Sequence, residues 1–272
     1  MSYQSALREH LASYASKKLG VSEDGKFRGK SYPHILPIEL EYLNILEPIR
    51  AEIQCYLKNN RNIKLHQYFH HLNSSQAFAF NLFYPYFSKN GLSANILSAA
   101  FGFKTSGVNW WKFEWIPDPI ENTNVDVAWN TSEQITVYCE VKLSEAEFGT
   151  AKCDERHQRK LAEIYHPRLK NLVSKELLEE KTFFNHYQLL RNVSFLADQN
   201  SHLVLLMPRE NKALDPQLTT VIAGLNPNTR ERVHIAYIED VLSKLIAEKT
   251  LPTELQAYAQ CLWEKYIPES AK

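Results

Sequence analysis

The sequence predicts an α/β fold, with a mixed central sheet that is flanked by helices and preceded by a helical N-terminal extension. Residues 135–143 alternate between apolar and polar side chains, as a strand with one buried face does. A shorter strand-like run at 124–129 lies just upstream, so the two runs predict a hairpin. Residues 183–197 then have helical periodicity and lead into a continuous apolar run at 202–208, which is typical of a strand covered on both faces.

Residues 1–72 are expected to form a helical lead-in. Apolar side chains recur at helical spacing between Leu40 and Leu57, whereas residues 20–37 are polar and have little periodicity. The pattern therefore predicts helical structure after a looser polar segment.

Two helices and a strand are expected before the hairpin. Asn73, followed three residues later by a glutamine, suits a helix N-terminus, and the helix has a buried body at 77–83 that Pro85 disturbs. A second helix is expected at 94–101. The aromatic run at 110–115 is short and rich in β-forming residues, which predicts a strand that leads to the hairpin.

A charged helix is expected after the hairpin, at 152–165, with Pro167 ending it. The helix at 183–197 has a buried stripe, and Gln188 and Arg191 lie one turn apart on its flank. A strand, a helix and a second strand in succession imply a parallel crossover, so the sheet is expected to be mixed.

The composition favours a soluble, cytoplasmic protein. Of 272 residues 44% are hydrophobic, which is ample for a core, and the formal net charge is zero, so any nucleic acid must be bound by local basic patches. The four cysteines form no CxxC pair, which argues against a disulfide framework or a zinc ribbon. No apolar run approaches the length of a membrane span, so no membrane association is expected.

The hairpin predicts a site at its open end. Asp126 and Glu140 are equidistant from residue 133, which lies within the polar loop 130–134. Directly opposed residues of an antiparallel pair share a face, so these two carboxylates are expected to face each other. Lys142 lies two positions beyond Glu140 and projects from the same face.

Two carboxylates on adjacent strands can bind a hard divalent cation through oxygen and leave positions open for water and phosphate. Mg²⁺ suits such a site, and Mn²⁺ is an alternative. A lysine beside the carboxylates can orient the attacking water and balance charge on the phosphate. Together these groups predict phosphodiester hydrolysis.

The sequence resembles the PD-(D/E)xK nuclease superfamily, which has the restriction-endonuclease-like fold. The resemblance is carried by Asp126 and by Glu140-Val141-Lys142. The resemblance implies a Mg-dependent endonuclease acting on nucleic acid, with DNA favoured and with restriction, repair and defence all open as its role. A homodimer would let two such centres cut both strands. The resemblance also implies that Asp126, Glu140 and the Val141 carbonyl bind the metal. Lys142 would position the water, and Gln188 would add a polar group from the following helix.

The resemblance covers residues 74–207, within a single nuclease-like domain expected over residues 1–272. Residues 73–210 would be its catalytic core. Residues 211–272 would add a strand at 233–238 and a helix at 251–266.

Two assignments stay open at this stage. The proline that often precedes the family aspartate is replaced by Val125, whereas a literal Pro-Asp occurs at Pro117-Asp118. Asp126 is preferred over Asp118, because a hairpin with Asp118 opposite the glutamate would turn inside a strand-like stretch. Glu114 is a candidate third carboxylate, since it alternates with aromatic residues in its strand.

The main rival is a non-catalytic nucleic-acid-binding or scaffold protein that keeps the fold. Its binding surface would be the basic helix 152–160 with Arg168 and Lys170, although interspersed glutamates also suit a solvated face. A thiol enzyme using Cys139 or Cys153 is a weaker rival, because Cys139 lies on the apolar face of its strand and Cys153 has no clear paired base.

Pairs of histidines and cysteines one helical turn apart are also weak as zinc sites, because further ligands at defined spacing are lacking. The pairs considered are His66 with His70 and Cys153 with His157.

Overall fold

The computed structural model describes residues 2–269, which form two compact units. The helical unit comprises the described residues up to 108, together with 208–210 and those from 237 onward. The sheet unit comprises residues 109–207 and 211–236. The single domain expected from the sequence stays a prediction.

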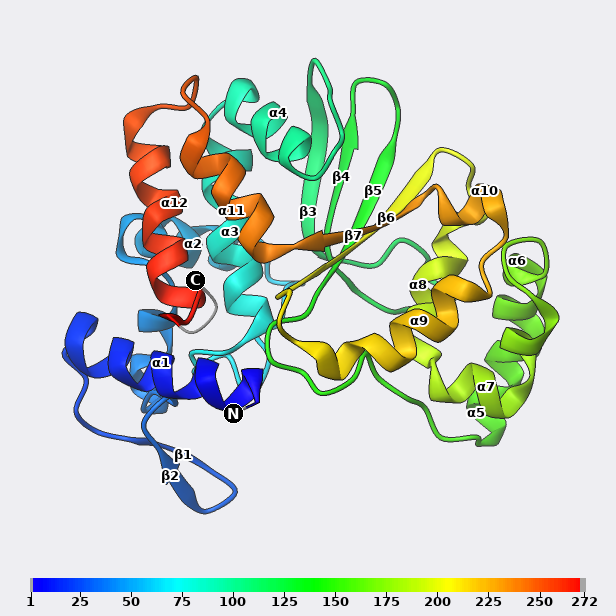
Figure 1. Ribbon diagram of the computed structural model, residues 1–272, viewed down its shortest axis with the longest axis horizontal. Coiled ribbons are helices and arrows are strands. Elements are labelled where there is room, and N and C mark those ends of the chain that lie inside the picture. Colours follow the sequence, from blue (N-terminus) through cyan, green and yellow to red (C-terminus); the bar gives the residue numbers. More distant parts are fainter. Residues whose placement is uncertain (1, 270–272) are drawn as a thin grey trace. The chain divides into compact units, whose positions relative to one another are not determined.

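Six α-helices of eight or more residues make up most of the described helical unit, and Figure 1 shows them in blue to teal and in orange to red. They are α1 (Tyr3–Lys18), α2 (Glu47–Asn59), α3 (Ser75–Lys89), α4 (Gly91–Ala100), α11 (Ile238–Ala247) and α12 (Thr253–Tyr266). A 3₁₀ turn, η1 (Ile38–Asn44), precedes α2. The expected helical lead-in is thus present, and so is the expected C-terminal helix.

A small hairpin interrupts the helical lead-in. Its strands are β1 (Gly25–Phe27) and β2 (Lys30–Tyr32), joined by Arg28 and Gly29, which both have positive φ. Two consecutive residues of positive φ are what a tight turn of type I′ requires. The polar sequence did not predict this hairpin, because strands of three residues provide no measurable alternation.

Helix α3 continues through Pro85 to Lys89, so the expected disturbance at this proline does not end it. A proline at this position leaves the carbonyl of Asn81 without its intrahelical donor. The hydroxyl of Tyr258 on α12 donates to that carbonyl at 2.9 Å and replaces the missing bond. The helix begins one residue later than expected, because Ser74, and not Asn73, is its N-cap.

The sheet unit is built on five strands in the order β3-β4-β5-β6-β7 (Figure 1). Their bounds are β3 (Val108–Trp115), β4 (Val125–Thr131), β5 (Thr136–Val141), β6 (Ser201–Met207) and β7 (Val233–Tyr237). The β4–β5 pair is antiparallel and the β5–β6 pair is parallel, so the sheet is mixed, as predicted.

The predicted hairpin register is confirmed. Val127 lies opposite Cys139 and Asn130 lies opposite Thr136, so the next step along the ladder sets Asp126 against Glu140. Both faces of these strands are buried or nearly so, and a slip of one residue would exchange the side chains of the polar face, such as Asn130 and Glu140, with those of the apolar face.

Helical segments between β5 and β6 and between β6 and β7 complete the sheet unit. Between β5 and β6 lie α5 (Glu155–Lys160), the π-helical η2 (Leu161–Tyr165), α6 (His166–Leu169), η3 (Lys175–Leu178), α7 (Glu180–Asn185), α8 (Tyr187–Ser194) and η4 (Phe195–Ala197). Between β6 and β7 lie η5 (Lys212–Leu214), α9 (Asp215–Ala223) and α10 (Pro227–Arg230).

Two helix boundaries differ from those expected. Pro167 does not end the charged helix, because the helical backbone continues from α5 through η2 into α6, whose second residue is Pro167. The helix expected at 183–197 is divided at His186, whose φ of −122° is outside the helical range. Because of this break, α8 begins at Tyr187, one residue before Gln188.

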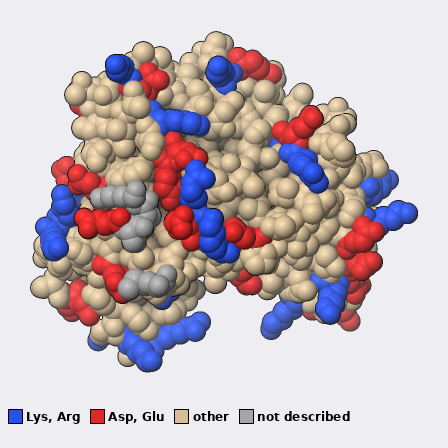
Figure 2. All heavy atoms as spheres, in the orientation of Figure 1, with Lys and Arg blue, Asp and Glu red and all other residues tan. Residues whose placement is uncertain are grey.

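Charged side chains are interspersed on the face drawn in Figure 2, where blue and red groups alternate. This distribution agrees with a formal net charge of zero. No helix among the described residues has the length and hydropathy that a bilayer span requires.

Candidate active site

Asp126 and Glu140 come together where the β4–β5 ladder ends. Oδ2 of Asp126 accepts a hydrogen bond of 2.7 Å from the main-chain N–H of Val141. This bond ties the Asp126 side chain to the neighbouring strand, one residue beyond Glu140. The carboxylate is therefore held in place by the backbone that also carries the glutamate.

Glu140 is only 2% exposed, and both of its oxygens have partners. The Lys142 ammonium lies 2.8 Å from Oε1, and the side-chain amide of Gln188 donates to the same oxygen at 2.6 Å. The side-chain amide of Asn192 donates to Oε2 at 2.8 Å, and the guanidinium of Arg191 lies 3.9 Å from that oxygen. A buried carboxylate is tolerated only with such compensation.

Gln188, at the start of α8, joins the carboxylate to the ammonium. Its amide nitrogen donates to Glu140, and its amide oxygen accepts a 3.0 Å bond from Lys142. The main-chain N–H of Gln188 donates to the Gly149 carbonyl at 3.2 Å. Gly149 has a φ of +128°, which L side chains rarely adopt, and a Cβ built there would lie 2.7 Å from Oε1 of Gln188, so a larger residue would be strained and would displace that amide.

The two carboxyl groups have opposite pKa shifts. Burial, with the charges of Glu140 and Glu114, raises the pKa of Asp126 well above its usual value. Burial also opposes ionisation of Glu140, but the charges of Lys142 and Arg191 outweigh it and lower the pKa of that group. The proton is therefore favoured on Asp126 and disfavoured on Glu140.

Lys142 stays charged although it is only 7% exposed. Burial alone would lower its pKa, but Glu140, Glu145 and Asp126 together raise it above the usual value. Because the ammonium keeps its proton at neutral pH, it can donate hydrogen bonds to a water or a phosphate oxygen, but it does not act as a base.

The donor atoms fit a hard cation. Asp126 and Glu140 offer only oxygen, and the raised pKa of Asp126 marks a place where negative charge lacks full compensation. Among residues 2–269, no group of three or more His, Cys, Asp or Glu side chains is arranged to hold a metal. A cation bound here would therefore depend on water and phosphate for its remaining ligands, as Mg²⁺ commonly does.

Glu114 lies near the pair without completing a set of three carboxylates. Its charge contributes to the raised pKa of Asp126, and its Oε2 accepts a 2.9 Å bond from the side chain of Asn124. Its φ of +47° is in the left-handed region, which residues other than glycine rarely adopt. A role for Glu114 as a ligand stays a prediction.

Asp118 does not lie opposite Glu140, because the register gives that position to Asp126. Asp118 is in the loop after β3, where it forms an ion pair with Arg168. The hydrogen bond from Arg168 lowers the pKa of Asp118.

Asn192 and Gly149 are the two contacts that the sequence did not single out. Asn192 lies four residues after Gln188, so helical spacing alone places both on one face of α8. Gly149 carries no such signal, because its role depends on a loop approaching the helix.

The thiol groups are poorly suited to nucleophilic chemistry. Cys139 is completely buried, and burial raises the pKa of its thiol. Cys153 is exposed, and its pKa is raised by the combined effect of desolvation and Glu180. Neither thiol is therefore favoured as a thiolate.

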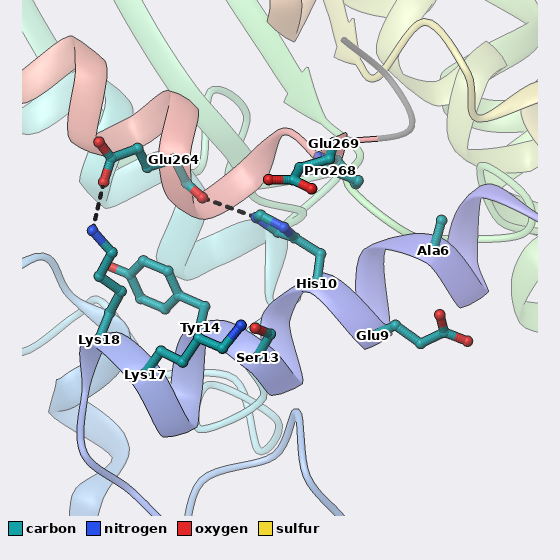
Figure 3. A pocket seen from close by; sticks show the side chains of 10 residues that line it. All are labelled: Ala6, Glu9, His10, Ser13, Tyr14, Lys17, Lys18, Glu264, Pro268 and Glu269. Carbon is teal, nitrogen blue, oxygen red and sulfur yellow. Dashed lines mark hydrogen bonds and ion pairs between the residues drawn. The ribbon is translucent and has the colours of Figure 1, made fainter.

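A hollow in the helical unit, of about 510 Å³, lies between α1 and the C-terminal end of α12 (Figure 3). Glu264 pairs with Lys18 at 3.1 Å, and its carbonyl contacts the His10 ring at 2.9 Å. The rim reaches Glu269, the last described residue. The hollow contains paired surface charges and none of the carboxylates of the candidate site.

The comparisons with known proteins identify a family for this chain. The model of a family described as restriction endonuclease associating with ARP matches residues 8–267, which is nearly the whole chain. Neither the curated proteins nor the solved structures include a significant match.

We predict that Gly149→Ala weakens any activity of this site by about tenfold or more, because the added methyl group displaces the amide of Gln188. Steady-state kinetics checks this. Gly102→Ala is the matched control, since Gly102 also has a positive φ, of +98°, but has no neighbour within 4 Å of the added carbon. Equal losses in both variants would show that backbone strain, and not the contact with Gln188, is responsible.

We predict that Asp126→Asn raises the melting temperature of the metal-free protein at neutral pH. The folded state binds the Asp126 proton more tightly than the unfolded chain, so wild-type stability falls as pH rises from about 4 toward the raised pKa. Each unit of that shift costs about 1.4 kcal/mol, and asparagine avoids the cost. Thermal melts in EDTA from pH 4 to 8 should show a difference of about 2 °C or more that grows with pH and is absent near pH 4.

Proposed function

The chain belongs to the family of restriction endonucleases associating with ARP, and on this premise we propose that it is a metal-dependent nuclease that hydrolyses phosphodiester bonds in DNA. One observation carries the proposal: Asp126, Glu140 and Lys142 meet at one end of a hairpin, and Gln188 joins the last two. A solvent-facing cross-strand pair would be exposed, whereas Glu140 and Lys142 are almost completely buried.

Asp126 and Glu140, with the main-chain carbonyl of Val141, would hold Mg²⁺ or Mn²⁺. The bound cation would supply Lewis-acid stabilisation of the charge that develops on the phosphate. Asp126 would lose its proton when the cation binds, because a cation takes the place of the proton between the negative groups.

Lys142 would orient the attacking water and balance the growing negative charge on the phosphate. Its raised pKa supports this role, because the ammonium remains a donor at neutral pH. Gln188 fixes the separation between this ammonium and Glu140 by contacting both. Asn192 restrains the second oxygen of the glutamate and so prevents the carboxylate from rotating.

A single such centre per chain cuts one strand at a time. We therefore infer that cleavage of both strands requires either a homodimer with two centres or two successive nicks by one centre. In a plasmid assay, nicked circles that accumulate before the linear form indicate successive nicking, whereas direct conversion to the linear form indicates paired centres.

We predict that Lys142→Ala slows Mg²⁺-dependent cleavage of supercoiled plasmid by about 100-fold or more, because the donor to the water is lost while both carboxylates remain. Asp126→Asn and Glu140→Gln should abolish cleavage, since each removes a charged ligand. The matched controls are Lys175→Ala and Glu163→Gln, which remove exposed charges elsewhere in the sheet unit and should cleave as the wild type does.

Cleavage that survives Asp126→Asn but is lost in Asp118→Asn would contradict the proposed site. No cleavage by the wild type with either metal, on duplex and on single-stranded DNA, would favour the rival function of a non-catalytic DNA-binding protein. Duplex binding without a metal would then support that rival directly.

A further inference from the structure

The loop between β3 and β4, residues 116–124, exposes two isoleucines. Ile120 is 78% exposed and Ile116 is 38% exposed. Among the described residues, Ile120 is the most exposed of the large hydrophobic side chains. A single exposed apolar side chain is ordinary on a protein surface, so the inference depends on how this one is held and where it lies.

The chain before Ile120 is fixed by Asp118. Oδ1 of Asp118 accepts a 2.8 Å bond from the main-chain N–H of Ile120, while its carbonyl accepts a 2.8 Å bond from the N–H of Asn122. The other carboxylate oxygen pairs with Arg168 of α6. One aspartate thus closes the turn around Ile120 and attaches it to a helix.

The chain after Ile120 is fixed by Glu121, which is completely buried. Its Oε1 accepts bonds from the hydroxyl of Tyr165 at 2.5 Å and from the hydroxyl of Thr123 at 2.6 Å. The ammonium of Lys160 donates to the carbonyl of Glu121 at 2.5 Å. Ile120 is therefore held outward between two anchored residues. In a flexible loop the same side chain could turn toward the protein, which these anchors prevent.

This loop lies next to the candidate site at both of its ends. It leaves β3 one residue after Glu114, and it enters β4 one residue before Asp126. A simple hairpin connection takes two to five residues, whereas residues 116–124 extend well beyond that. Ile120 lies at the middle of this extra length, six residues after Glu114 and six before Asp126.

The acidic residues of the loop are paired with cations, which affects how the loop could contact DNA. Arg168 and Lys160 belong to the basic surface that the sequence predicted as a phosphate-binding candidate. In the structure Arg168 pairs with Asp118, and Lys160 pairs with Glu121. The two acids are thereby compensated, so the loop neither repels DNA strongly nor offers a free cation to a phosphate. What it presents outward is an apolar side chain.

We propose that Ile120 is a wedge that packs against the bases of duplex DNA bound at the candidate site. The inference rests on the proposed nuclease function and adds the kind of contact that the loop makes. Apolar side chains that enter a groove and separate stacked base pairs act without a phosphate contact. Asp118 and Glu121 are positioning residues for this wedge, because they reach the DNA only through Ile120.

The test measures binding of a fluorescent 30-base-pair duplex to the full chain carrying Lys142→Ala, with Mg²⁺ present, so that cleavage does not interfere. Adding Ile120→Ser should weaken binding by about tenfold, as burial of a large aliphatic side chain implies. The slope of the logarithm of affinity against the logarithm of salt concentration should not change, because no phosphate contact is lost. Ile120→Leu should restore binding.

Ile235→Ser is the matched control, since Ile235 is 39% exposed on β7 in the same unit. It should bind as the parent protein does. A second readout is 2-aminopurine placed in the duplex, whose fluorescence should rise on binding to the parent protein and rise less with Ile120→Ser.

Equal affinity of the parent and Ile120→Ser proteins overturns the inference and leaves the nuclease proposal standing. A changed salt slope with Ile120→Ser also overturns it, because phosphate contacts would then be involved. If the parent protein binds no duplex at all, the proposal of a DNA substrate fails and the wedge fails with it.

Discussion

The structure of the site depends on the groups that compensate the buried negative charge of Glu140. Glu140 is almost inaccessible to water, and an uncompensated carboxylate in that position would cost several kcal/mol. Lys142 from its own strand and Gln188 and Asn192 from α8 supply that compensation. The hairpin and the helix must therefore meet at one point, and the loop that carries Gly149 must approach closely enough to hold Gln188.

The same arrangement makes the two carboxyl groups unequal. Glu140 has an ammonium and a guanidinium nearby, which lower its pKa, whereas Asp126 faces Glu140 and Glu114, which help to raise its pKa. Carboxyl groups with opposite shifts at one place are typical of functional sites. In this chain the raised pKa of Asp126 favours a proton or a cation beside that carboxylate. Lys142 stays charged and can act as a hydrogen-bond donor.

Strand alternation and hairpin symmetry predicted the most informative part of the structure. The mixed sheet, the register that sets Asp126 against Glu140 and the helix that carries Gln188 all follow from side-chain periodicity, which burial enforces. Asn192 was within reach of the same reasoning, because it is one helical turn from Gln188.

Features that depend on contacts between distant segments were not predictable in this way. The sequence gives no sign that Tyr258 replaces the hydrogen bond lost at Pro85, and so α3 is longer than expected. Gly149 and the anchors of the loop around Ile120 are equally invisible to periodicity. In each case the partner is more than thirty residues away, and only the folded chain brings it close.

The central claim is that Asp126 and Glu140 form one metal site. Calorimetric titration of the full chain with Mg²⁺ and with Mn²⁺, in the presence of a short duplex to supply phosphate oxygens, tests it most directly. The account predicts binding to the wild type and to Lys142→Ala, and loss of that binding in both Asp126→Asn and Glu140→Gln. Binding that persists in either carboxylate variant at wild-type affinity would contradict it.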